Sequence, residues 1–258
     1  MPQAVMRFAA PPAPHRTQVD RARRWLALAG SVVVLALPGV SAPAECPAYE
    51  NRPPQSRDGS GRVYLGREIA PVMGHLGAAW LERPEREAEE KPSILIRELG
   101  LQPGDTVADI GAGTGYFSFR IAPLIGNGKV LAVDVQPEML AMIRTRAKTA
   151  GVANVAPVQG RPDNPSLPDA SADLVLMVDV YHEFSQPCEM MRAVARALKP
   201  GGRLALVEYR AEDPTVPIKP LHKMTQAQAI REMAAAGLRW QRTVDALPWQ
   251  HLMFFTRQ

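Results

Sequence analysis

Short apolar runs alternate with amphipathic stretches along the second half of the chain. Five of the runs have the length of a buried strand: 106–110, 129–134, 154–158, 172–178 and 203–208. The stretches before and between them that have helical periodicity are 92–99, 116–125, 137–150 and 187–198. Strands that alternate with helices in this way predict a parallel sheet with right-handed crossovers.

The C-terminal part of the pattern differs. Thr225 is placed to cap a helix that runs to Ala236, and Gly237 follows that helix. Two segments, 238–244 and 251–256, then come without a helix between them, which predicts one antiparallel strand. The whole pattern predicts an α/β fold, a doubly wound and mostly parallel seven-stranded sheet with one antiparallel strand and helices on both faces.

The segments ahead of this domain lack its alternation. Residues 45–61 have no periodicity and predict a linker. Residues 62–91 form an accessory segment that ends in a run of charges, which we interpret as a solvated helical face with Glu87 four residues before Lys91. We expect the main domain to span residues 92–258.

Residues 1–44 have the layout of a secretory signal peptide or an N-terminal anchor. Arg23 and Arg24 precede an apolar run at 25–37, and small residues typical of a cleavage site follow at 42–44. The run is shorter than the roughly 20 residues of a membrane-spanning helix, and the arginine pair resembles a twin-arginine export signal. We expect an exported, periplasmic protein or one associated with a membrane through residues 25–37. A gene start placed too far upstream would instead make the protein cytoplasmic.

The formal charge of the chain belongs to this leader. The 258 residues include 30 basic and 26 acidic side chains, for a net charge of +4. Five arginines and one acid lie in residues 1–44, so the remainder holds 25 of each sign. We therefore expect no nucleic-acid partner. The two cysteines, Cys46 and Cys188, exclude a disulfide framework and a cysteine-based zinc cluster, but they allow one bridge in an oxidising compartment.

A glycine loop follows the first strand of the predicted sheet. Gly111, Gly113 and Gly115 lie where the strand turns into a helix, and Asp134 ends the next strand about 20 residues later. A dinucleotide fingerprint would place its third glycine at position 116, which is Tyr116. The loop therefore predicts a cofactor site of another kind.

Over residues 92–258 the chain resembles class I S-adenosylmethionine-dependent methyltransferases, whose first motif reads Asp-x-Gly-x-Gly-x-Gly. The resemblance implies S-adenosylmethionine as the cofactor, with its methionine part on the glycine loop and both ribose hydroxyls on the acid of the second motif. An acid after the third strand often lies near the adenine amine in this family, and Asp163 is the candidate here, against a plain turn. The cofactor-binding residues implied in this way are Asp109, Gly111, Gly113, Gly115, Asp134, Val135 and Asp163.

Polar side chains gather at the end of the fourth strand, where open α/β sheets bind their ligands. Asp179 resembles the family's fourth motif, which lies beside the transferred methyl group. His182 is the candidate general base because its unperturbed pKa lies near 6.5, and a local capping role is the alternative. Glu183 or Tyr181 would replace it. The fifth strand ends in Glu208, Tyr209 and Arg210, and His222 follows in a loop that faces the same end.

We expect no metal site, because Asp179, His182, Glu183 and His222 lack tight ligand spacing in the sequence. The resemblance also implies that the accessory segment, with Met73, His75 and Trp80, folds over the cofactor as a lid. The motifs of adenine, glutamine and cytosine methylation are absent, and arsenite methylation needs more cysteines. The acceptor expected is therefore a small molecule. The alternatives are a non-catalytic protein that binds S-adenosylmethionine and a nicotinamide-dependent oxidoreductase.

Overall fold

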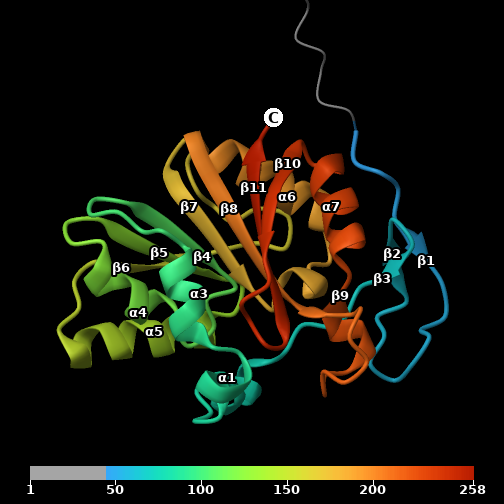
Figure 1. Ribbon diagram of the computed structural model, residues 1–258, viewed down its shortest axis with the longest axis horizontal. Helices are drawn as coiled ribbons and strands as arrows, with labels where there is room; N and C mark the ends of the chain where they lie inside the picture. The colour runs from blue at the N-terminus through green and yellow to red at the C-terminus, as the bar shows by residue number, and fades with distance from the viewer. Residues whose placement is uncertain (1–44) are drawn as a thin grey trace, which may run out of the picture. The chain divides into compact units, whose positions relative to one another are not determined.

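The computed structural model describes residues 45–258, which form one compact unit (Figure 1). The expected signal peptide or anchor, residues 1–44, lies outside the described residues. Within 45–258 no helix is long and apolar enough to cross a membrane.

The central sheet has the predicted architecture. Its strands run in the order β10-β11-β8-β7-β4-β5-β6, and only β11 is antiparallel to its neighbours, while a two-residue strand, β9, adds to β8 in parallel as an eighth strand. The bounds are β4 Thr106–Ile110, β5 Lys129–Asp134, β6 Val155–Gln159, β7 Ala172–Val178, β8 Leu198–Arg210, β9 Lys223–Met224, β10 Leu238–Val244 and β11 Gln250–Arg257.

Helices cover both faces of this sheet, as predicted (Figure 1). One face packs against α3, α4 and α5, and the other packs against α6 and α7, because alternate strand residues point to opposite faces. The bounds are α3 Pro92–Glu98, α4 Ser118–Ile121, α5 Pro137–Ala150, α6 Pro187–Ala197 and α7 Gln226–Ala235, with 3-10 turns at Ala122–Leu124, Tyr181–Glu183 and Pro220–His222. The Thr225 hydroxyl accepts a hydrogen bond from the Gln228 N–H and so caps α7, as expected.

The segment expected as a linker is fastened to the main domain. Three short strands, β1 Glu50–Asn51, β2 Arg62–Tyr64 and β3 Arg67–Glu68, form a small antiparallel sheet. A disulfide joins Cys46 to Cys188 at the start of α6, and the Tyr49 hydroxyl donates a hydrogen bond to Glu189, 2.5 Å away. Sequence periodicity could not reveal these attachments because they join residues about 140 positions apart.

The charge run at 82–91 is not a solvated helical face, and that interpretation was wrong. It forms only a short helix, α2 Arg86–Glu89, after a 3-10 turn at His75–Gly77 and α1 Ala78–Leu81. Arg86 and Glu90 are buried, at 4% and 2% exposure, and pair with each other over 2.6 Å. Glu87 accepts a hydrogen bond from Ser93 instead of meeting Lys91. The run therefore has an exposed side, with Glu82, Glu85 and Glu87, and an inner side where the buried charges are paired.

Candidate active site

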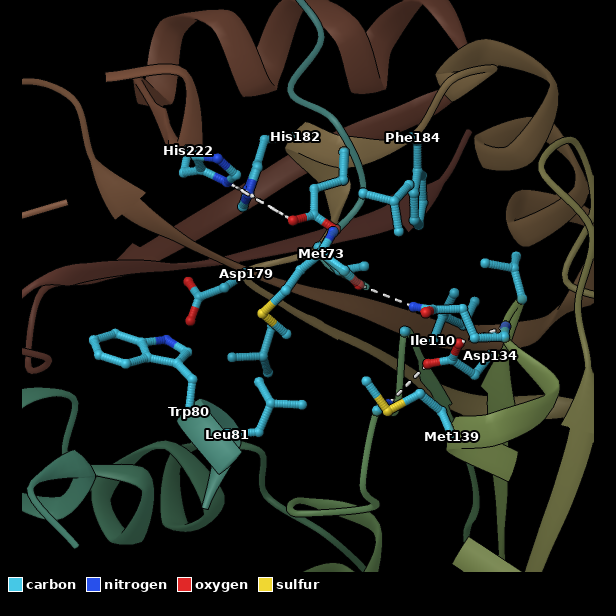
Figure 2. Close-up of a pocket in the computed structure, with 18 of the residues that line it drawn as sticks. Met73, Trp80, Leu81, Ile110, Asp134, Met139, Asp179, His182, Phe184 and His222 are labelled. Atoms are coloured by element: carbon cyan, nitrogen blue, oxygen red, sulfur yellow. Dashed lines mark hydrogen bonds and ion pairs between the residues drawn. The ribbon is translucent and has the colours of Figure 1, made fainter. Parts of the chain in front are cut away.

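A cavity of about 480 Å³ opens at the carboxyl ends of the parallel strands (Figure 2). That volume is within the range of small-molecule sites. Its floor comes from the ends of β4, β5, β7 and β8, and its cover comes from the accessory segment. The main lining residues are Val72, Met73, Trp80, Leu81, Arg86, Ile110, Gly111, Gly113, Asp134, Val135, Met139, Gly160, Asp179, His182, Glu183, Phe184, Tyr209, Ile218 and His222.

The glycine loop wraps the end of β4. All three of its glycines have positive φ, which L side chains rarely adopt. The N–H groups of Gly111 and Ala112 donate to the Val133 carbonyl, which ties the loop to the end of β5. Gly113 also allows a close approach, since a Cβ there would lie 2.5 Å from Leu81 Cδ1 of the accessory segment.

Asp134 lies in the cavity wall beside the loop. One carboxylate oxygen accepts from the Gly113 N–H and the other from the Gln136 N–H, each at 2.9 Å. Burial raises the pKa of this carboxyl, and the backbone donors oppose that rise. A carboxylate has about four lone-pair positions, so both oxygens keep acceptor capacity for further hydroxyl donors. Asp134 can therefore take the place that the resemblance assigned to it.

Three other predicted cofactor residues, Asp109, Gly115 and Asp163, do not line the cavity. Asp109 is 3% exposed beneath the loop, where it accepts a 2.6 Å hydrogen bond from the Ser118 hydroxyl of α4. Burial raises its pKa to about 6, against the effect of the Ser118 donors. Asp163 lies outside the cavity, where it pairs with Arg161 over 3.2 Å. Pro162 and Gly160 line the cavity in its vicinity. Position in the sequence identified the right loops without fixing where each side chain points.

His182 is held at the acceptor side of the cavity by a carboxylate that the predicted site lacked. Its Nδ1 lies 2.6 Å from Glu208 Oε2, while Glu208 Oε1 accepts from the N–H groups of Tyr181 and His182. Both side chains are buried. Glu208 ends the fifth predicted strand, so the signal for it was present in the sequence, but only the fold shows that it meets His182.

Glu183 and His222 complete a cluster with His182. His222 Nδ1 lies 3.0 Å from His182 Nε2, and Glu183 Oε1 lies 3.8 Å from His182 and 3.7 Å from His222. Burial raises the pKa of Glu183 to about 6. Burial and the neighbouring His182 lower the pKa of His222 to about 4. Figure 2 shows the two imidazoles side by side at one end of the cavity.

Asp179 follows β7 in a left-handed conformation, with φ of 51°, which is strained for an aspartate. Its Oδ2 accepts from Gln250 over 2.7 Å, and its Oδ1 is buried without a hydrogen-bond partner. Burial, together with the charges of Glu90 and Glu208, holds the pKa of this carboxyl well above its ordinary value. The strained backbone and the free oxygen mark it as a functional candidate.

Tyr181 does not reach the cavity. Its hydroxyl donates to Glu232 of α7 over 2.8 Å, and Glu232 also receives two hydrogen bonds from Arg67 of β3. All of this network is buried, and burial beside Glu232 raises the Tyr181 pKa well above 10. The structure gives Tyr181 a role in attaching the N-terminal sheet, rather than at the reacting atoms.

A segment of residues 72–75, which we call the strap, crosses the cavity. The Met73 N–H donates to Glu183 over 3.1 Å, its carbonyl accepts from the Gln136 side chain over 3.0 Å, and the His75 N–H donates back to Gln136 over 2.8 Å (Figure 2). Trp80 and Leu81 line the same side. The accessory segment thus lies where the lid was expected.

Sequence reasoning missed a second set of lining residues, Arg86 and Tyr209. The guanidinium of Arg86 lies over the Tyr116 ring, 4.3 Å from its centroid, and Tyr209 donates to Glu90 over 2.7 Å. Arg83 also pairs with Glu90. The sequence feature that could have indicated Arg86 was the run of charges at 82–91, because buried charges need partners from elsewhere in the fold.

The residues of the cofactor half fit S-adenosylmethionine. A glycine loop, a carboxylate with spare acceptor positions and an apolar wall at Val135 and Met139 border one continuous cavity. This set suits hydroxyl donors and an apolar ring better than a pyrophosphate. The nicotinamide alternative has no structural support at the loop, where Tyr116 is buried in place of a third spaced glycine.

Comparison with known proteins agrees with this site. Residues 107–202 match the family model described as a methyltransferase domain. The uncharacterized methyltransferase YcgJ of Bacillus subtilis is 30% identical over 160 residues, which make up 61% of this chain and 62% of that protein. UbiE of Salmonella arizonae, a ubiquinone/menaquinone biosynthesis C-methyltransferase, is 30% identical over 141 residues, 54% of this chain and 55% of that protein. The chain thus spans between half and two thirds of the length of these relatives.

A solved structure gives the same family. A SAM-dependent methyltransferase from Aquifex aeolicus superposes with a TM-score of 0.67 and 26% identity, over 71% of this chain and 98% of that one. Both comparisons fall on the domain that holds the glycine loop and the polar strand ends. Residues 107–202 are therefore a methyltransferase domain, and through it the chain is similar to S-adenosylmethionine-dependent methyltransferases.

Proposed function

We propose that the protein transfers a methyl group from S-adenosylmethionine to a small apolar or aromatic acceptor, such as a phenol or quinol. The observation that carries this proposal is the single cavity that joins Asp134 and the glycine loop to His182 and Asp179. Methyl transfer needs a cofactor and an acceptor in line within one space that excludes water.

Different residues of the chain act at the two ends of that cavity. Asp134 accepts the cofactor's hydroxyls, and the glycine loop allows its close approach. Bound S-adenosylmethionine supplies a methyl group on a positively charged sulfur. At the other end, the Glu208 carboxylate orients His182 so that Nε2 faces the cavity and accepts the acceptor's proton.

The apolar lining supports the acceptor class. Met73, Trp80, Phe184 and Ile218 line the same cavity as the histidines, and so give apolar surface to an apolar or aromatic acceptor. The Salmonella relative is named for the biosynthesis of ubiquinone and menaquinone, which are quinones. A phenolic ring with one ionisable hydroxyl would match both the apolar walls and the base.

We also propose that the protein works outside the cytoplasm, exported or anchored by residues 25–37. The leader pattern supports this, and so does the disulfide between Cys46 and Cys188, because such bonds persist in oxidising compartments.

Calorimetric titration of the protein with S-adenosylmethionine tests the cofactor half. We expect Asp134→Ala to weaken binding by at least tenfold and Asp134→Asn to weaken it less, since an amide keeps one acceptor. Asp169→Ala, at an exposed aspartate far from the cavity, is the control. Circular dichroism checks that each variant folds.

Mass spectrometry of phenols and quinols incubated with protein and cofactor tests the transfer. A mass gain of one methyl group, lost in His182→Gln, supports the proposal. Tight cofactor binding without transfer to any acceptor of this class would favour the non-catalytic alternative. A folded protein that does not bind the cofactor would overturn the proposal altogether.

A further inference from the structure

Three side chains at the acceptor end have the donor set of a transition-metal site. His182 Nε2, His222 Nδ1 and Glu183 Oε1 lie within 4.8 Å of one another, and all three residues line the cavity. Two imidazoles and one carboxylate are the protein ligands of many catalytic zinc sites, which keep further positions open for water or substrate. Spacing in the sequence did not predict this, because His222 comes from a loop forty residues after His182.

The distances fit an ion. The three atoms form a triangle with sides of 3.0, 3.7 and 3.8 Å. A point equidistant from them lies about 2.0 Å from each, which is the length of a zinc–nitrogen or zinc–oxygen bond. Metal binding would require the His222 proton to move from Nδ1 to Nε2, so that both imidazoles offer a lone pair to that point.

The surroundings prepare these groups to bind a cation. Glu208 accepts the Nδ1 proton of His182, which leaves Nε2 with its lone pair toward His222; this is the carboxylate–histidine arrangement that orients metal ligands. The Met73 N–H holds Glu183 Oε2, so that Oε1 is left on the side of the imidazoles. Lys219 also lines the cavity, but its ammonium pairs with Asp58.

We propose that His182, Glu183 and His222 bind one divalent transition-metal ion, of the zinc type, with Glu208 as the positioning residue. The ion's open positions face the acceptor half of the cavity and take an oxygen of the acceptor. The role of the ion rests on the proposed function, whereas its binding does not. A bound cation would lower the pKa of a coordinated hydroxyl, whose proton would then pass to water instead of to His182 Nε2.

Metal binding is tested on the full chain, purified without a histidine tag and stripped with a chelator. Cobalt(II) titration followed by visible absorption, and zinc counted by mass spectrometry after dialysis, give stoichiometry and coordination. We expect one ion per chain and an affinity at least tenfold weaker in His222→Ala and in Glu183→Gln. His251→Gln is the matched control, because His251 also lies near a glutamate, 2.8 Å from Glu212, but does not line this cavity.

Each outcome separates the metal site from the cofactor site. Loss of the cobalt spectrum in both cluster variants, with folded protein and unchanged S-adenosylmethionine binding, supports the metal site. Equal binding in wild type and both variants, or no ion retained by the folded wild type, overturns it. Metal binding by a protein that fails to bind S-adenosylmethionine would overturn the proposed function and leave this inference standing.

Discussion

At the scale of single residues, Glu208 decides which nitrogen of His182 carries a proton. Its carboxylate can only accept, so the proton stays on Nδ1 and the lone pair stays on Nε2, toward the cavity. Its other oxygen accepts from two backbone N–H groups, which fixes the start of the Tyr181–Glu183 turn. One buried side chain thus sets both the position and the tautomer of the histidine.

Glu208→Gln should reverse this tautomer with little effect on the fold. The glutamine oxygen can still accept from the backbone, but its NH₂ group would face Nδ1 and favour the proton on Nε2. We expect cobalt(II) affinity and methyl transfer to fall by about ten- to a hundredfold, with unchanged affinity for S-adenosylmethionine. The histidine nitrogen NMR shifts report the tautomer directly. A variant that keeps Nδ1 protonated and loses neither property would contradict this role.

Asp109 should make the protein less stable as pH rises from about 4 to 6. Its pKa is near 6 in the folded protein, above the ordinary aspartate value, so the folded state keeps a proton that the unfolded state releases in this range. Each pKa unit is about 1.4 kcal/mol, which gives a loss on the order of 2–3 kcal/mol. Nearby Asp134 raises this pKa further, while Arg86 lowers it.

Asp109→Asn isolates that contribution, since asparagine can still accept from Ser118 but does not titrate. Denaturant unfolding from pH 4 to 7 gives the free energy of unfolding of both proteins. The free energy of unfolding of the variant, relative to that of the wild type, should increase as pH rises through this range. A constant difference between the two free energies would show that Asp109 does not titrate there.

At the scale of elements, the glycine loop and the accessory segment fit each other at one contact. A Cβ at Gly113 would meet Leu81 at 2.5 Å, and the φ of Gly113 is 55°. The loop is therefore constrained both by its own backbone and by the cover above it.

Gly113→Ala should weaken S-adenosylmethionine binding and destabilise the protein by about 1–3 kcal/mol. Leu81→Ala in the same chain should recover the steric part of that loss but not the backbone part. Titration and unfolding of the two single variants and the double variant measure the coupling. If the effects of the two substitutions on affinity and on the free energy of unfolding are additive, the contact between Gly113 and Leu81 does not constrain the loop.

Arg67 should hold the N-terminal sheet against α7. The side chain of Glu232 has 0% exposure, so Arg67→Met leaves its charge buried without its partner, at a cost of about 3–5 kcal/mol. Glu232→Gln added to that variant should restore part of the stability, because the uncompensated charge is gone. Thermal unfolding of the wild type and of these two variants measures the recovery, and its absence would contradict this network.

The elements that could be predicted are those that carry their own periodicity. The bounds of β4, β5, α5, β7 and β10 match the predicted ranges at both ends, because the length and periodicity of each can be seen in its own sequence. The run from Glu82 to Lys91 could not be predicted, since its buried Arg86 and Glu90 depend on Tyr116 and Tyr209, which come from other parts of the chain. The same holds for Tyr181, whose partner Glu232 lies 51 residues away.

At the scale of the whole molecule, the disulfide closes a long loop. Cys46 and Cys188 are 142 residues apart, and the bond holds the N-terminal sheet near the start of α6. Cys46→Ser should lower stability by about 2–4 kcal/mol, because the unfolded chain gains freedom. Denaturant unfolding with and without reductant measures it, and the reductant should have no effect on the variant. Equal stability of oxidised and reduced wild type would show that the bond contributes nothing.

The sequence could predict the location of the candidate site, because the order of strands and helices brings its residues to one edge of the sheet. Gly111, Asp134, Asp179 and His182 end or follow three neighbouring parallel strands, and such ends meet at one edge of a sheet. The direction of each side chain could be seen only in the fold. Asp109 and Asp163 do not line the cavity, whereas Glu208 contacts His182 of the cluster.

The strap has a kinetic consequence. Its few hydrogen bonds connect Gln136, next to the cofactor acid, with Glu183, in the histidine cluster. One opening motion would therefore free both ends of the cavity together, so cofactor exchange and product departure would share a single rate. If opening of the strap is slower than methyl transfer, its rate would limit turnover, and acceptor entry and cofactor release would depend on the same event.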